Sequence, residues 1–200
     1  MNFRSVRSLL VAGLFALVAC NGGPEGLVRW SARRCVATDA SADDGGDASA
    51  EACERAVHRA VNTALPMPRP DPRVFSCRSR VSGEGATRTF EVAFKATDPN
   101  GATLELGGAG GGGTAPSALG ANATTCTVTL REGAAVATGE CGAQCTVTVT
   151  GYAEASRTIS GRISCVGMGE SDPAPRWQIR NAEGVPGMAA DFSAANCSGL

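Results

Sequence analysis

Aromatic residues are scarce in this chain of 200 residues, where they make up 4% of the sequence. Large rings normally supply much of the buried area of a core, so this core has to be built from Val, Ile, Leu, Ala and a few Phe. The chain also lacks an apolar run of the roughly 20 residues that a transmembrane helix needs. Its formal net charge is −1, and without a basic excess the sequence gives no indication of nucleic acid as a partner.

Imidazole is almost absent as well, because His58 is the only histidine. A Ser-His-Asp triad would have to use this residue, and no G-x-S-x-G motif is present. A zinc site would also lack histidine ligands. We therefore expect no metal, no cofactor and no enzymatic activity. The alternative is a carboxylate-based hydrolase of the cell envelope, which needs two acids flanking one bond, although no spacing singles out a pair among Glu84, Glu91, Glu105, Glu132, Glu140, Glu154 and Asp172.

Cysteine, by contrast, is abundant, with nine residues, of which Cys20 differs in kind from the rest. It follows a short segment that contains Arg4 and Arg7 but no acid, and then the apolar run from Leu9 to Val18. That run is too short to span a bilayer of about 30 Å as a helix. Residues 1–19 are therefore predicted to be a signal peptide.

The sequence Leu17-Val18-Ala19-Cys20 resembles the lipobox of bacterial lipoproteins. The resemblance covers the first twenty residues and implies that Cys20 is diacylated and that signal peptidase II cuts the chain before it. It also implies anchoring in the membrane of the cell envelope. Asn21 stands where an Asp would favour the inner membrane, so the outer membrane is expected if the organism has one. The alternative is an ordinary secretory signal that is cut near Ala19.

The other eight cysteines form an even set that can pair completely. Disulfides persist in an oxidising compartment, which agrees with export. Each bridge typically stabilises a fold by about 2–4 kcal/mol, and this offsets the shortage of aromatic side chains.

The region before residue 73 is predicted to differ from the rest of the chain. Residues 20–48 are interpreted as an acylated tether followed by an acidic, glycine-rich loop. Residues 49–65 are predicted to form one amphipathic helix, capped by Ser49, because Cys53, Val57, Val61 and several alanines recur at helical spacing. Residues 66–72 contain four prolines and are predicted to be a stiff connector.

Residues 73–200 alternate between apolar and polar side chains and are predicted to form a β domain. Phe90, Val92, Phe94 and Ala96 share one face, and similar faces recur around Val128, Val147 and Ile163. The sequence from Asp98 to Gly101 indicates a turn. Many short strands of this kind favour an antiparallel β-sandwich or a partly open barrel braced by disulfides.

The alternation also suggests disulfide pairs. A hairpin centred on Ala155 would pair Cys145 with Cys165, and one centred on Gly133 and Ala134 would pair Cys126 with Cys141. The remaining pairs would be Cys35–Cys53 and Cys77–Cys197. Eight cysteines allow 105 sets of pairs.

Loops at strand ends are the expected binding sites, because a rigid scaffold tolerates variation there. The glycine-rich segment 107–119 is interpreted as one flexible loop, and its match to G-x-G-x-x-G lacks the surrounding βαβ unit. The segment 167–176 is the second loop, and Glu170, Asp172, Arg176 and Trp177 are the candidate binding residues there. We therefore expect a lipid-anchored, non-catalytic structural or binding module, held in the membrane by its acyl chains and facing an envelope protein or glycan.

Overall fold

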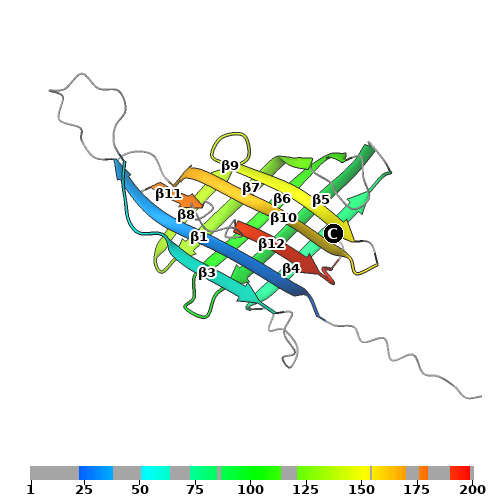
Figure 1. Ribbon diagram of the computed structural model, residues 1–200, viewed down its shortest axis with the longest axis horizontal. Coiled ribbons are helices and arrows are strands. Elements are labelled where there is room, and N and C mark those ends of the chain that lie inside the picture. Colours follow the sequence, from blue (N-terminus) through cyan, green and yellow to red (C-terminus); the bar gives the residue numbers. More distant parts are fainter. Residues whose placement is uncertain are drawn as a thin grey trace, which may run out of the picture.

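The computed structural model of the protein describes residues 23–37, 51–63, 73–84, 87–113, 121–153, 155–169, 176–179 and 190–198. None of them belongs to a helix with the length and hydrophobicity of a membrane span. Antiparallel β-structure dominates instead, as predicted (Figure 1). The strands are β1 (Glu25–Ala37), β2 (Glu51–Cys53), β3 (Val57–Asn62), β4 (Phe75–Ser82), β5 (Arg88–Thr97), β6 (Thr103–Gly113), β7 (Ala121–Glu132), β8 (Ala135–Glu140), β9 (Cys145–Ala153), β10 (Thr158–Met168), β11 (Arg176–Ile179) and β12 (Ala190–Ala195).

All twelve strands belong to one sheet, with the order β11-β1-β12-β10-β9-β7-β6-β5-β4. β2 and β3 pair with β1, and β8 pairs with β7. The sheet has two halves, because β7 and β9 pair only at Ala121↔Val149 and Asn122↔Thr148. We call β4 to β8 the β5 half, and the other seven strands the β1 half.

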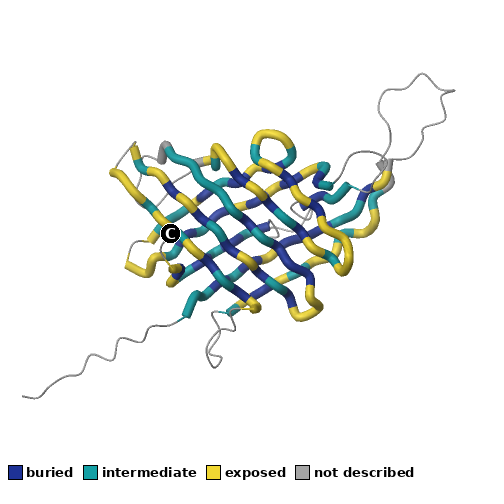
Figure 2. The backbone as a smooth tube through the Cα atoms, turned by 180° about the vertical axis from the view of Figure 1, so that it is seen from behind, coloured by how far each residue is buried: buried dark blue, intermediate teal, exposed yellow. Residues whose placement is uncertain are grey.

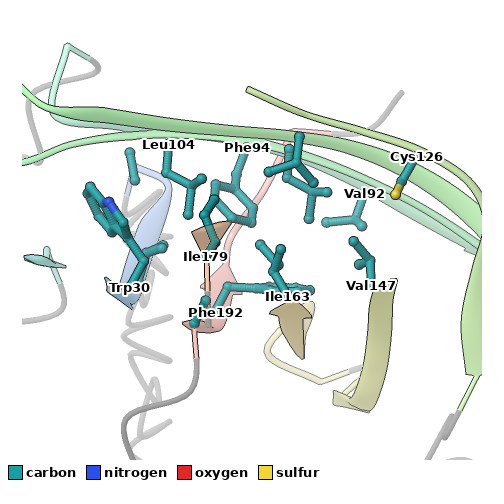
Figure 3. Packing of buried hydrophobic residues seen from close by; sticks show 14 of the residues in the cluster. Trp30, Val92, Phe94, Leu104, Cys126, Val147, Ile163, Ile179 and Phe192 are labelled. Atoms are coloured by element: carbon teal, nitrogen blue, oxygen red, sulfur yellow. The ribbon is translucent and has the colours of Figure 1, made fainter. Parts of the chain in front are cut away.

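The two halves face each other across the core. In Figure 1 the strands β1, β10 and β12 lie in front of β5 and β6 and cross them at a steep angle. Figure 3 shows side chains from both layers meeting between them, with Phe94 and Leu104 on one side and Phe192 and Ile163 on the other. The ring of Phe94 lies 5.3 Å from that of Phe192, measured between ring centroids. Phe94 and Phe192 are thus placed where the halves meet.

Strand alternation decides which side chains reach this core. Phe90, Val92, Phe94 and Ala96 are all buried, so the predicted inward face of β5 is confirmed. The outward positions of the same strand are exposed or half-buried. Figure 2 shows this alternation of buried and exposed residues along the strands, seen from behind.

Two glycines make room for the aromatic rings. A Cβ atom added at Gly26 of β1 would lie closer than 3.0 Å to the ring of Phe75, and one added at Gly161 of β10 would meet the ring of Phe192 equally closely. Each ring therefore covers a glycine backbone, and this close approach increases the contact that each scarce ring makes.

The structure contains the four disulfides that the sequence analysis predicts. The register of two hairpins explains two of them. Cys145 lies opposite Cys165. Thr127 lies opposite Glu140, which brings their chain neighbours Cys126 and Cys141 together. The Cα–Cα distances lie between 4.0 and 5.0 Å, within the range that a bridge permits or close to it. The pairs are Cys35–Cys53, Cys77–Cys197, Cys126–Cys141 and Cys145–Cys165.

Residues 196–198 join the far edge of the β5 half and form a seam. Ser198 forms an isolated parallel bridge with Arg78 of β4. The amide of Ser79 donates to the carbonyl of Ser198 at 3.1 Å. The disulfide Cys77–Cys197 fixes the same junction. The sheet therefore closes on itself over a short stretch, which agrees with the predicted partly open barrel.

The predicted helix over residues 49–65 is wrong. This segment contributes β2 and β3, both antiparallel to β1. Cys53 lies opposite Cys35, and Val61 is buried with Arg59 beside it on the same face. Pairing with β1 and the disulfide Cys35–Cys53 outweigh the local helical spacing.

The predicted boundary at residue 73 also changes. Residues 25–37, assigned to the tether, form the long strand β1 in the same sheet as the later strands. Residues 107–113, interpreted as a flexible loop, belong to β6 and pair with β5 and β7. The predicted signal peptide with Cys20, the acidic loop after residue 37 and the connector over residues 66–72 lie outside the described residues.

Candidate functional site: an outer groove over β4 to β8

One row of residues crosses the outward surface of the β5 half. Register places Arg78 beside Ala93, Ala93 beside Gly107, and Gly107 beside Thr127. Thr127 lies beside Glu140 of β8. Because the centre of this row carries only a methyl group and a hydrogen atom, the surface is hollow there between larger side chains. We call this hollow the outer groove.

The outer groove has two connected parts. The larger has a volume of about 720 Å³ and extends from the seam to β7. The smaller, of about 510 Å³, continues towards β8, and both parts are lined by Ala93, Gly107 and Thr127. The polar residues of the larger part are Ser76, Arg78, Lys95, Glu105, Thr127, Thr129, Asn196 and Ser198, with Pro24 at the seam.

Gly107 determines the depth of the outer groove. No atom lies within 4 Å of a Cβ added at this position, so packing does not require a glycine there. Gly101 and Gly133 also have open space, but their φ angles of 85° and 59° explain them. Gly107 shows no such backbone angle. The structural effect of its missing side chain is to leave the groove open.

The charges of the larger part are unevenly paired. Glu105 lies 3.2 Å from the Lys95 ammonium and 3.7 Å from Arg131, so this carboxylate is neutralised by two cations. Arg78 is exposed on β4. Within the described residues no ion pair involves its guanidinium. The larger part therefore presents a positive group that is available to a ligand.

A second polar constellation, the Arg59 cluster, lies between β3 and two hairpin ends of the β5 half. The guanidinium of Arg59 donates from Nη1 to Asp98 Oδ2 at 3.1 Å and from Nη2 to Glu132 Oε2 at 2.9 Å. Hydrogen bonding to Glu132 and the charges of both acids raise the pKa of Arg59, against the lowering effect of burial. Arg59 therefore stays charged, and the cluster joins the two halves of the sheet.

Asp98 has no lone pair left for chemistry. Its side chain is 2% exposed, and Oδ1 accepts from the amides of Asn100 and Ala102 at 3.0 and 2.8 Å. Oδ2 accepts from Arg59 and from the Asn100 side chain. This carboxylate organises the predicted turn at residues 98–101 and neutralises Arg59.

The single histidine forms a pair with a serine. Ser31 and His58 lie opposite each other on β1 and β3, and the Ser31 hydroxyl lies 2.5 Å from Nδ1 of His58. Ser31 is only 5% exposed, which prevents it from reaching a substrate. Glu54 contacts Arg34, at 3.8 Å. No described carboxylate contacts His58, so the pair lacks the third member of a triad.

Glu91 and Glu140, two of the candidate acids, are not placed as a hydrolase requires. Glu91 and Glu140 line the smaller part of the outer groove. They stand on β5 and β8, three strand spacings apart in the sheet, which corresponds to about 14 Å. Glycosidase pairs lie roughly 5–9.5 Å apart. Within the described residues, no group of three or more His, Cys, Asp and Glu side chains is placed to hold a metal ion.

Only part of the candidate binding loop at residues 167–176 belongs to the described residues. Glu170 and Asp172 lie outside the described residues. Arg176 and Trp177 belong to β11 and are Cα partners of Cys35 and Arg34, and half-buried Trp177 packs against the core. These two residues thus stand on a strand of the β1 half, and neither lines the outer groove.

The sequence analysis does not predict the outer groove, although the alternation along β6 indicates that Gly107 faces outward. Leu104 and Leu106 share the inward face, so continuing the alternation places Gly107 on the outside. Treating the glycines as a loop ended that pattern too early. The cross-strand neighbours Ala93 and Thr127 become visible only with the register of three strands.

Comparison with known proteins adds no assignment. No protein-family model matches the sequence, and no similar curated protein and no similar solved structure was found.

Proposed function

We propose that this protein is a lipid-anchored binding module of the cell envelope. Acyl chains on Cys20 hold it in the membrane, and the β domain presents the outer groove to a ligand without catalysing a reaction. The observation that carries this proposal is the set of four disulfides, because such bridges persist in oxidising compartments. The lipobox-like sequence before Cys20 supports the same location.

The position of the outer groove fits an anchor at Cys20. Pro24 lines the groove and follows Cys20 by four residues, which span at most about 14 Å when fully extended. A ligand in the groove is then held close to the membrane surface. Two or three acyl chains give stable anchoring, whereas one chain binds only reversibly.

Replacing the acylated cysteine tests the location. We expect Cys20→Ser to abolish incorporation of a palmitate analogue and to move the protein from the membrane fraction to the soluble envelope fraction. Cys35→Ser is the matched control, since it removes a bridging cysteine and should leave acylation unchanged. Unchanged processing and membrane fractionation of Cys20→Ser would refute the anchor.

A further inference from the structure

We infer that the outer groove binds a short saccharide that carries a single anionic group, and that Arg78 receives this group. The inference deepens the proposed function by naming the class of ligand. It depends on the shape, the polar lining and the charge distribution of the groove.

The shape suits a short chain of sugar units. Small-ligand sites commonly have volumes of about 300–1,000 Å³, and the larger part, of about 720 Å³, lies within this range. The smaller part continues from it over Gly107. A ligand that is a few units long can therefore extend from the seam across the strands.

The lining matches the hydrogen-bonding groups of a sugar. Ser76, Thr127 and Thr129 place hydroxyl groups along the larger part, and Asn196 adds an amide at the seam. Hydroxyl and amide groups both donate and accept hydrogen bonds, as sugar hydroxyls do. The floor at Ala93 and Gly107 leaves room for the body of a sugar ring.

The charges select one anionic group and determine its place. In the larger part, exposed Arg78 has no ion pair among the described residues, while Lys95 is held by Glu105 at 3.2 Å. The smaller part carries Glu91 and Glu140 instead. An acid is attracted at the seam end, and a second acid further along would be repelled by these carboxylates. A dense polyanion is therefore a poor ligand.

The experiment measures saccharide binding by the full mature lipoprotein in detergent micelles. The probes are sialyllactose, a trisaccharide with one carboxylate, the neutral trisaccharide maltotriose, and polyphosphate as the dense polyanion. We expect sialyllactose to bind at least tenfold more tightly than the other two. Arg78→Gln should weaken its binding at least tenfold, and Gly107→Val should abolish binding by filling the groove.

Arg80→Gln is the matched control, because Arg80 is the next exposed arginine on β4 and lines neither part of the groove. Equal loss in Arg78→Gln and Arg80→Gln, preference for polyphosphate, or no binding of sialyllactose would each overturn the inference. The fractionation of Cys20→Ser keeps the two proposals distinguishable. Membrane anchoring without saccharide binding refutes this inference alone, whereas saccharide binding without anchoring refutes the location alone.

Discussion

The Arg59 cluster, which joins the two halves of the sheet, and the outer groove of the β5 half both gather charged side chains, yet their charges are used in opposite ways. Arg59 is held by two carboxylates at 3.1 and 2.9 Å, and the other oxygen of Asp98 accepts from the amides of Asn100 and Ala102. In the groove, Arg78 has an exposed guanidinium without an ion pair among the described residues. The cluster looks more like an active site, but its groups satisfy one another.

The difference teaches how to separate a structural constellation from a binding surface. A buried charge that loses its partner is costly, so clusters such as Arg59 with Asp98 hold the fold together. An exposed charge beside a hollow costs little free energy when it has no partner, and it can bind a ligand. Removing the Arg59 cluster should therefore reduce stability more than binding. Filling the outer groove or removing its exposed charge should reduce binding more than stability.

The seam disulfide should show the largest effect on stability. Cys77 and Cys197 are separated by 120 residues, and a loop of that length corresponds to about 5 kcal/mol of unfolded-state entropy. We expect the double variant Cys77→Ser/Cys197→Ser to lose stability of this order, and also to lose sialyllactose binding, because the seam forms one wall of the groove.

Urea unfolding under oxidising conditions measures this loss. The double variant Cys35→Ser/Cys53→Ser is the control, with a separation of only 18 residues, and it should cost less and retain binding. Equal effects of the two double variants on binding would show that the seam does not shape the groove.

Removing the Arg59 guanidinium should cause the second-largest loss of stability. Arg59→Met leaves Asp98 buried without its cation, and breaking a buried pair in this way costs about 3–5 kcal/mol. Lys95→Met, which breaks a half-exposed pair with Glu105, should cost about 1 kcal/mol or less. Chemical denaturation compares the two variants, and similar losses would contradict the structural role assigned to the Arg59 cluster.

Two glycine substitutions should change stability least, one lowering it and the other raising it. Gly161→Ala places a methyl group against the backbone oxygen of Thr148 and the ring of Phe192, and overpacking typically costs about 1–3 kcal/mol. Gly107→Ala meets no atom within 4 Å, and replacing a strand glycine stabilises by roughly 0.5–1 kcal/mol. Thermal unfolding distinguishes them. A stability loss in Gly107→Ala would show that packing, and not the groove, requires this glycine.

Much of the fold could be predicted from local alternation. The inward face of β5 follows from the spacing of Phe90, Val92 and Phe94, and the hairpin register places Cys145 opposite Cys165. Both depend on residues close in sequence. The segment around Val57 and Val61 was mispredicted because valines four residues apart suit one face of a helix and one face of a strand equally well. Only the partner strand β1 decides between them.

The outer groove depends on information that a local pattern does not contain. Ala93, Gly107 and Thr127 become neighbours through two strand pairings. Each residue alone is an ordinary small or polar side chain. A glycine has no side chain, so it does not indicate which face of a strand it occupies. The glycine-rich run after Leu106 therefore shows too little alternation of apolar and polar side chains to be assigned to a strand.

The seam at residues 196–198 has a consequence for the order in which the sheet is assembled. β4 obtains its bridge to Ser198 and its disulfide to Cys197 only after the 120 residues that separate Cys77 from Cys197 have followed it along the chain. Until then β4 keeps an open edge, and such edges are prone to pair with other chains. Residues 196 and 198 line the outer groove, so a chain that has not yet formed the seam lacks this wall of the groove.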